Sequence, residues 1–360
     1  MGPNVEQLAP YQPGKPIDEV RRELGLTDVI KLASNENPLG PSPRAIEAIH
    51  RCAETVHLYP DGSAHELRQA LAAHHGTPPD HLIFGNGSDE LLHYLGVTFL
   101  NPGDEVIQGD PSFVRYEAAA VLHGAVLHKA PLRNHVHDLQ AMADRINART
   151  RMVFIANPNN PTGTIVTEDE VRRFVERVPD RCIVVFDEAY HGYVTSPDYP
   201  DTIRYVQEGR NVVVLRTFSK IYGLAGLRVG YGLARPEIVR LIEKVREPFN
   251  VNLIAQAAAC EALRDTAHLE RSARVNRQGK RFLEAAFDEL GLTYAPSEAN
   301  FVWFDVGRSA SDVAAGLLRR GVIVRAFNLP GCERFIRVTI GTQEENERFL
   351  AALKDVLAGP

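Results

Sequence analysis

The sequence contains few cysteines, and their spacing fits neither a disulfide framework nor a zinc site. The four cysteines, Cys52, Cys182, Cys260 and Cys332, lie far apart, and no CxxC pair occurs. The histidines are scattered too, and no HxxxH metal spacing flanks the adjacent His74 and His75. We therefore expect no disulfides and no metal site, and a reducing cytoplasm fits this composition.

Long apolar runs and a strong charge of either sign are also missing. No stretch approaches the roughly 18 apolar residues that a membrane helix needs. The start, MGPNVEQLAPYQPGKP, lacks the basic and apolar regions of a signal peptide. The formal net charge of −6 is mild, so neither nucleic acid nor an anionic membrane is an expected partner. These absences favour a cytoplasmic protein that acts on small molecules.

Two nucleotide-binding motifs are absent as well. The sequence contains no GxxxxGK[ST], and its segment GNGSDE (85–90) has Glu90 where GxGxxG requires the third glycine. The glycine-rich loops therefore support neither a nucleoside-triphosphate site nor a dinucleotide site, and this disfavours an oxidoreductase.

What the chain does contain is an alternation of apolar strands and helices. Strands are expected in HLIFG, EVIQG, AVLHKA, RMVFIAN, CIVVFDE, NVVVLRT and LRVGYGLA, with helical patterns between them. Continuous apolar strands separated by helices predict an α/β fold whose mostly parallel central sheet is covered on both faces. Near residue 250 consecutive helices precede a smaller α/β unit. We expect an N-terminal arm (1–33), a large domain (34–250) and a small C-terminal domain (251–360).

Three polar loops follow three of these strands. ANPNNPTG (156–163), FDEAY (186–190) and TFSKIYGLAGLRVGYG (217–232) each come at the carboxyl end of a predicted parallel strand. Open α/β sheets bind ligands at that edge. Asn, Pro and Gly also form ordinary turns, so each loop alone is only moderately specific.

Taken in order, these loops resemble those of the fold-type I pyridoxal-phosphate (PLP) enzymes of the aspartate-aminotransferase-like class. The resemblance implies that Lys220 holds PLP as a Schiff base and later moves a proton between the substrate α-carbon and the cofactor. Asp187 would pair with the pyridine nitrogen, while Tyr190 and Asn160 would bond to the 3′-oxygen. An isolated lysine is usually a solvated surface residue, so the surrounding motif carries this assignment.

The cofactor phosphate needs a site of its own, and GNGSDE is the candidate. It follows a strand and opens a helix, whose free N-terminal amides suit an anion. The resemblance implies that Gly87, Ser88 and Asp89 bind the phosphate, and that Ser219 and Arg228 add a hydroxyl group and a positive charge. Turn chemistry alone fits an ordinary strand-to-helix turn with a serine cap equally well.

Two aromatic residues complete the expected cofactor site. Phe113 in DPSFVRYE stands where the family has an aromatic residue, often tyrosine, that stacks on the pyridine ring; it could otherwise be a core residue. Tyr59 in HLYPDG resembles the family tyrosine that reaches the cofactor phosphate of the neighbouring subunit, and is otherwise a simple Tyr-Pro turn. The resemblance therefore implies a homodimer with shared active sites.

Further segments narrow the resemblance to the histidinol-phosphate aminotransferases, nearly end to end. They are YQPGKP (11–16), LASNENPLGPSP (32–43), EANFVWF (298–304), GVIVRAF (321–327) and RFIRVTIGT (334–342). This subfamily interconverts L-histidinol phosphate and 2-oxoglutarate with imidazole acetol phosphate and L-glutamate, in histidine biosynthesis.

The resemblance to this subfamily also implies four substrate-binding residues. Arg325 and Arg337 are the expected anion binders, because a planar guanidinium makes paired bonds to phosphate, and Tyr11 and Asn35 would line the pocket. An aromatic amino-acid aminotransferase and a PLP-dependent decarboxylase of a phosphorylated amino acid share most cofactor residues and stay open as alternatives. A non-catalytic PLP-binding regulator is disfavoured by the short arm and the negative charge.

Overall fold

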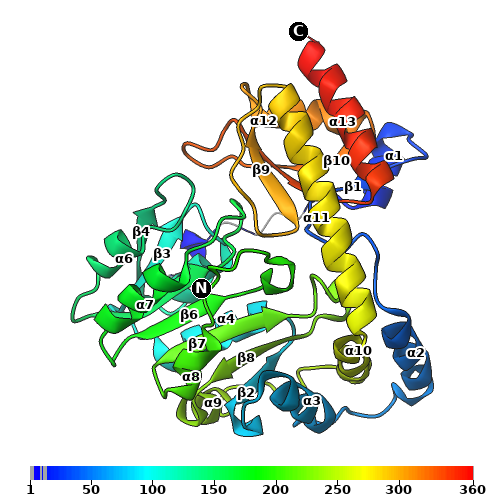
Figure 1. Ribbon diagram of the computed structural model, residues 1–360. Helices are drawn as coiled ribbons and strands as arrows, with labels where there is room; N and C mark the ends of the chain where they lie inside the picture. Colours follow the sequence, from blue (N-terminus) through cyan, green and yellow to red (C-terminus); the bar gives the residue numbers. More distant parts are fainter. Residues whose placement is uncertain (1–3, 9, 11–13, 360) are drawn as a thin grey trace.

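A large sheet with helices on both faces forms the base of the molecule, and a smaller α/β part lies above it (Figure 1). This computed structural model describes residues 4–8, 10 and 14–359. The strand order of the large sheet is β2-β8-β7-β6-β5-β3-β4. Among the described residues, β8 is the one strand of this sheet that runs opposite to the others. Its strands are β2 (Leu82–Gly85), β3 (Glu105–Asp110), β4 (Val126–Pro131), β5 (Thr150–Ala156), β6 (Ile183–Asp187), β7 (Val212–Thr217) and β8 (Gly230–Ala234).

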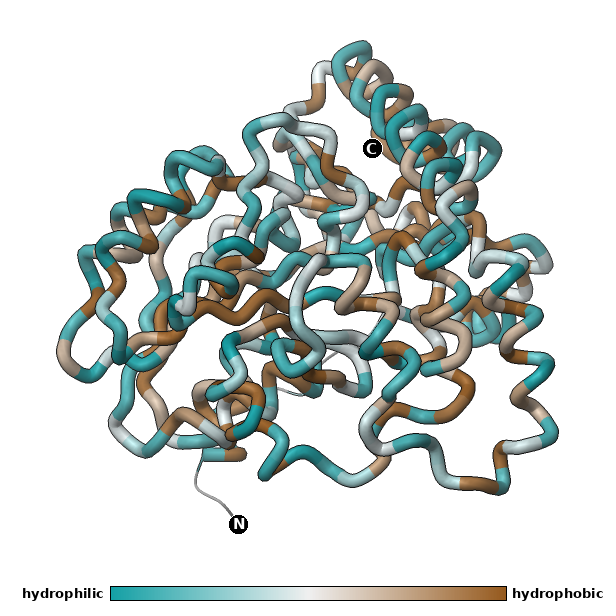
Figure 2. Tube along the Cα trace, turned by 60° about the horizontal axis from the view of Figure 1, so that its bottom comes forward, coloured by the Kyte–Doolittle hydropathy of each residue, from teal (hydrophilic) through white to brown (hydrophobic). Residues whose placement is uncertain are grey.

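Successive residues of the central strands pack into cores on opposite faces of this sheet. Val153 and Ile155 of β5 face the core formed with α2, α3, α6, α7, α8 and α10. Met152 and Phe154 face the core formed with α4, α5 and α9. Both faces are covered, which is why these strands carry apolar residues at consecutive positions. Figure 2 shows the strands as hydrophobic stretches inside more hydrophilic outer helices.

The helices around the sheet begin where the sequence offers caps. α7 starts with a capping box between Thr167 and Glu170, and Ser42 caps α2 at the amide of Ala45. The covering helices are α2 (Pro43–Cys52), α3 (His65–His75), α4 (Ser88–Phe99), α5 (Arg115–Val121), α6 (Leu139–Ala143), α7 (Glu168–Arg177), α8 (Ile203–Gln207), α9 (Pro236–Ile242) and α10 (Leu253–Arg264).

The first of these helices is shorter than its sequence pattern predicts. The pattern AIEAIHRCAETV after Ser42 and Pro43 predicts a helix up to Val56, but α2 ends at Cys52 and a 3-10 turn follows. The Thr55 hydroxyl donates to the Cys52 carbonyl over 2.9 Å. A side-chain bond of this kind competes with helical hydrogen bonding, and this accounts for the early end.

The smaller part has its own sheet and core. Its sheet has the order β11-β12-β9, all antiparallel, and β10 pairs in parallel with β1 of the N-terminal segment. Its core joins side chains of α11, α12, α13 and this sheet. Its elements are α1 (Ile17–Leu24), β1 (Ile30–Lys31), α11 (Thr266–Glu289), β9 (Phe301–Asp305), α12 (Ala310–Arg319), β10 (Val322–Ile323), β11 (Arg325–Ala326), β12 (Phe335–Thr339) and α13 (Gln343–Ala358).

The long helix α11 connects the two parts (Figure 1). The expected α/β architecture with a mostly parallel sheet is confirmed. The division into domains at residues 33 and 250 stays a prediction. Around these positions, β1 pairs with β10, while the buried alanines of α10 belong to the core of the large sheet.

Candidate active site

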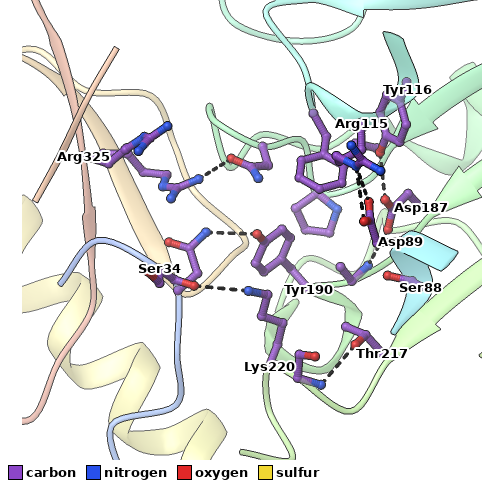
Figure 3. Close-up of a pocket in the computed structure, with 18 of the residues that line it drawn as sticks. Ser34, Ser88, Asp89, Arg115, Tyr116, Asp187, Tyr190, Thr217, Lys220 and Arg325 are labelled. Carbon is purple, nitrogen blue, oxygen red and sulfur yellow. Dashed lines mark hydrogen bonds and ion pairs between the residues drawn. The ribbon is translucent and has the colours of Figure 1, made fainter. Parts of the chain in front are cut away.

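A cavity of about 500 Å³ opens where β5, β6 and β7 end and where the smaller part meets the large sheet. It brings together most residues predicted from the sequence, although these come from segments up to 300 positions apart (Figure 3). The predicted residues that line it are Asn35, Ser88, Asp89, Phe113, Asn160, Asp187, Tyr190, Ser219, Lys220, Arg228, Arg325 and Arg337.

Lys220 stands in the loop after β7 and points toward the N-terminal segment. Its Nζ donates to the carbonyl oxygen of Ser34 over 3.3 Å and lies 5.6 Å from the centre of the Tyr190 ring. Burial, together with the nearby positive charges of Arg337 and Arg228, lowers the pKa of this amine to about 8. The amine can therefore lose its proton near neutral pH.

Asp187 ends β6 and is only 6% exposed. Its Oδ2 accepts a hydrogen bond of 2.9 Å from the Tyr116 hydroxyl, and its Oδ1 accepts one of 3.3 Å from the Ala189 amide. Burial raises the pKa of this carboxyl to about 6, against the opposite effect of these two bonds. The result is a carboxylate that can face a cationic ligand group inside the cavity.

Tyr190 is held from the opposite side by Asn35. The Asn35 Nδ2 donates to the Tyr190 Oη over 2.9 Å. Asn35 is itself fixed on β12, since its amide donates to Thr339 Oγ1 (2.9 Å) and its Oδ1 accepts from the same hydroxyl (3.1 Å). The ring of Phe301 on β9 meets Tyr190 edge to face at 5.1 Å. Tyr190 is thus tied to both sheets.

The two predicted anion-binding arginines face each other across one strand pair. Arg325 of β11 is directly opposite Arg337 of β12, and both guanidinium groups lie within 6 Å of the Phe327 ring. Arg337 donates to Asn160 Oδ1 and, over 2.7 Å, to the Ala33 carbonyl oxygen. The smaller part therefore presents two positive charges to the cavity, one of them oriented by fixed acceptors.

The opposite end of the cavity combines a helix N-terminus with a third guanidinium. α4 begins at Ser88, directly after Gly87 with φ +81°. Arg228 Nη1 lies 3.4 Å from Ser219 Oγ. A Cβ at position 87 would lie 3.0 Å from Arg228 Cζ and closer still to its Nη2, so glycine lets Arg228 rest against the start of the helix. Free amides and a cation at one place suit a phosphate group.

Comparison with known proteins identifies the family. The sequence model described as aminotransferase class I and II matches residues 27–353. The chain belongs to this family.

Relatives of known name share the whole length. The chain is 55% identical over 355 residues to a histidinol-phosphate aminotransferase of Moorella thermoacetica, covering 98% of this chain and 92% of the relative. It is 50% identical over 357 residues to that of Anaeromyxobacter sp., covering 99% and 98%. These relatives confirm the resemblance inferred from the sequence motifs.

Solved structures agree. The histidinol-phosphate aminotransferase of Sinorhizobium meliloti in complex with pyridoxal-5′-phosphate has a TM-score of 0.92 at 29% identity, covering 99% of this chain and 97% of that chain. A Thermus thermophilus aspartate aminotransferase mutant has a TM-score of 0.84 at 25% identity, covering 99% of both chains. The fold-type I class expected from the sequence is thereby confirmed.

Within this aminotransferase, sequence reasoning missed several cavity residues, two of which bond to predicted ones. Arg115 and Tyr116 begin α5, and both line the cavity. Arg115 Nε donates to both carboxylate oxygens of Asp89, at 2.9 and 3.2 Å, and Tyr116 bonds to Asp187. Their segment FVRYE reads as the start of a half-buried helix, and only the position of Phe113 two residues earlier pointed toward the site.

Two predicted residues in the described part of the chain do not line the cavity. Gly87 lies just behind it, against Arg228. Tyr59 is 82% exposed and stacks on Phe249 at 4.7 Å, outside the cavity of its own chain. Tyr11 lies outside the described residues.

Metal sites and membrane spans were also sought in residues 4–8, 10 and 14–359. Within these residues, no three His, Cys, Asp or Glu side chains lie close enough together to hold a metal ion. None of its described helices combines the length and apolarity that a membrane span requires.

Proposed function

We propose that this chain is a PLP-dependent histidinol-phosphate aminotransferase. It would interconvert L-histidinol phosphate and 2-oxoglutarate with imidazole acetol phosphate and L-glutamate, a step of histidine biosynthesis. The observation that carries the proposal is the 55% identity to the Moorella thermoacetica enzyme over 98% of this chain. The chemistry of the cavity supports it, since a lysine, a buried carboxylate and several guanidinium groups meet there.

The residues around the cavity fit PLP. A phosphate monoester needs cations and free amides at one end, which Arg228 and the first turn of α4 offer. A pyridine nitrogen needs an anion at the other end, which Asp187 offers, and an aldehyde needs the primary amine of Lys220. When bound, PLP supplies an electron sink for the negative charge that develops on the substrate α-carbon.

Lys220 carries two tasks in this proposal. Its neutral Nζ would hold the cofactor covalently, and the pKa of about 8 leaves part of the amine unprotonated near pH 7. The same Nζ would also hold and move the proton of the substrate α-carbon. Such positioned acid–base catalysis is worth about 10² to 10⁴ in rate. The Ser34 carbonyl oxygen holds the amine toward the substrate side of the cavity.

Other residues orient the reactants. Asp187 balances the positive charge of the pyridine nitrogen, and Tyr190 and Asn160 are the donors that we assign to the ring oxygen. Phe113, at the cavity wall, would stack on the pyridine ring. Ser88, Asp89 and Ser219 complete the phosphate end. Asp187 ends β6, and Ser88 and Asp89 begin α4, so the fold fixes the positions of these three side chains.

Arg325 and Arg337 would bind the substrate anion. Histidinol phosphate offers a phosphate group and no carboxylate, whereas glutamate offers carboxylates, and a planar guanidinium bonds well to both kinds of oxyanion. Arg337 is already oriented by Asn160 and the Ala33 carbonyl oxygen. Asn35, bonded to Tyr190, would line the same substrate space.

We further propose a cytoplasmic homodimer with shared sites. Val56, Leu58, Tyr59 and Phe249 are all more than 40% exposed, and although Tyr59 stacks on Phe249, the rest of the chain leaves these apolar side chains largely uncovered. A two-fold interface over this surface would let Tyr59 reach the phosphate end of the neighbouring cavity. The N-terminal arm with Tyr11 would then lie over the substrate.

A half-reaction assay tests the proposed function. The purified PLP-loaded protein is mixed separately with histidinol phosphate, glutamate, phenylalanine and threonine phosphate, and the cofactor spectrum is followed. We expect fast conversion by histidinol phosphate and glutamate and much slower conversion by phenylalanine. Preference for phenylalanine would instead indicate an aromatic aminotransferase. Release of carbon dioxide from threonine phosphate would indicate a decarboxylase.

A further inference from the structure

The side chain of Tyr116 reaches from helix α5 to the carboxylate at the end of β6. Its hydroxyl lies 2.9 Å from Asp187 Oδ2 (Figure 3), and the residue is 0% exposed. Burial and the neighbouring Asp187 charge both raise the pKa of Tyr116 well above its usual value. The hydroxyl therefore keeps its proton and acts as a donor near neutral pH.

Aromatic packing fixes the place of this hydroxyl. The Tyr116 ring stacks on Phe154 of β5 with centroids 4.7 Å apart and an angle of 3° between the planes. Phe113 meets the same ring edge to face at 5.6 Å. With Phe154 in the sheet core and Phe113 at the cavity wall, the phenol cannot swing away from Asp187 without breaking both contacts.

The other charges around Asp187 mostly oppose its ionisation. Asp89 on α4 and Glu188, next along the chain after β6, are like charges that raise its pKa, as burial does. Arg115 partly neutralises Asp89, and Arg216 of β7 pairs with Glu188 at 2.8 Å. The favourable contacts are Lys220 across the cavity, the Ala189 amide and the Tyr116 hydroxyl. Of the two hydrogen bonds, the one from Tyr116 is the shorter.

We propose that Tyr116 is a positioning residue that keeps Asp187 ionised and fixes the direction of its carboxylate toward the pyridine nitrogen of PLP. Each carboxylate oxygen holds one bond on its protein side, from Tyr116 and from Ala189, which leaves acceptor capacity toward the cavity. Tyr116 acts through Asp187 and not on the substrate. The inference rests on the proposed function only in so far as PLP binds in this cavity.

The test compares Tyr116→Phe with the wild-type holoenzyme and with Tyr231→Phe as the matched control. Tyr231 is also buried, and its hydroxyl shares a bond of 3.0 Å with His75, outside the cavity. The readouts are the pH titration of bound-cofactor absorbance without substrate, the PLP dissociation constant, and kcat and KM. Removing a bond to a charged acceptor is expected to raise the pKa of Asp187 by about one unit.

The expected results follow from that shift. A higher pKa keeps Asp187 protonated over more of the acidic range, so the acid-side midpoint of the absorbance titration moves up by about one pH unit. At pH 5, below both midpoints, we expect PLP affinity and kcat to fall about tenfold with KM nearly unchanged, and at pH 7 only about twofold, so the variants are compared at pH 5. Tyr231→Phe should move none of these values. Phe154→Leu keeps the hydroxyl but loosens its ring, so it should shift the midpoint the same way by less.

A double-mutant cycle decides whether Tyr116 acts through Asp187. In the background of Asp187→Asn, Tyr116→Phe should change PLP affinity and kcat by less than about twofold, because the charge it supports is gone. If the effects of the two substitutions multiply, or if Tyr116→Phe leaves the midpoint of the absorbance titration unchanged, the inference is wrong. The midpoint is measured without substrate, so it stands whichever amino acid the enzyme prefers. A wild-type protein that takes up no PLP would instead refute the proposed function.

Discussion

Alanine in place of Gly87 perturbs the start of α4 in two separable ways. The backbone there has φ +81° and ψ 163°, a region that only glycine populates readily, so alanine costs about 1–3 kcal/mol in folding free energy. The new Cβ would also lie 3.0 Å from Arg228 Cζ, so the guanidinium must move. If it loses a charge-assisted contact to the phosphate, worth about 1.5–3 kcal/mol, PLP binds about 10- to 100-fold more weakly.

Comparison with Gly103→Ala separates the displacement of Arg228 from the backbone strain. Gly103 has φ +86°, yet a Cβ there would meet nothing within 4 Å. This control carries backbone strain without a collision, so it should lower the thermal midpoint and leave PLP affinity intact. Thermal unfolding and titration of the apoproteins with PLP measure the two effects. Equal PLP affinity in Gly87→Ala and Gly103→Ala would refute the reasoning that Arg228 holds the phosphate from its position against Gly87.

Three further outcomes are expected. Borohydride reduction and peptide mapping should place the pyridoxyl group on Lys220, and Lys220→Ala should lower turnover by about 10² to 10⁴; a label on another lysine would exclude this assignment. Asp187→Ala should weaken PLP binding and the half-reaction far more than it lowers the thermal midpoint, whereas near-normal half-reaction rates would disprove the role of Asp187. Mixed dimers of Lys220→Ala and Tyr59→Ala subunits should be more active than either parent, because one site of each pair carries neither lesion. Mixed dimers without activity would remove Tyr59 from the partner's site.

Much of the large sheet could be predicted because strands buried on both faces appear in the sequence as continuous apolar runs. Strands such as β6 and β7 are apolar at consecutive positions, and the polar loops that follow them carry Asp187 and Lys220. Strand direction has no comparable sequence pattern. β8 is apolar like its neighbours, and nothing in GYGLA distinguishes the one antiparallel strand of the described large sheet from the parallel ones.

The supporting residues of the site could not be predicted for a different reason. Tyr116 and Arg115 lie on a short helix whose pattern reads as ordinary packing, and their partners are 71 and 26 positions away in the chain. The bond between Asn35 and Thr339 spans 304 positions. Such contacts depend on how the elements are placed in space, which local periodicity does not encode.

The segment 33–35 shows how chain length can matter more than side-chain identity. Arg337 and Lys220 bond here to the carbonyl oxygens of Ala33 and Ser34, which any amino acid would supply. Many substitutions at these two positions would therefore leave both acceptors in place. An inserted or deleted residue would shift the backbone by about 3.8 Å, more than a hydrogen bond tolerates. Substitutions at positions 33 and 34 should thus be tolerated, whereas a change in the spacing between β1 and Asn35 should not.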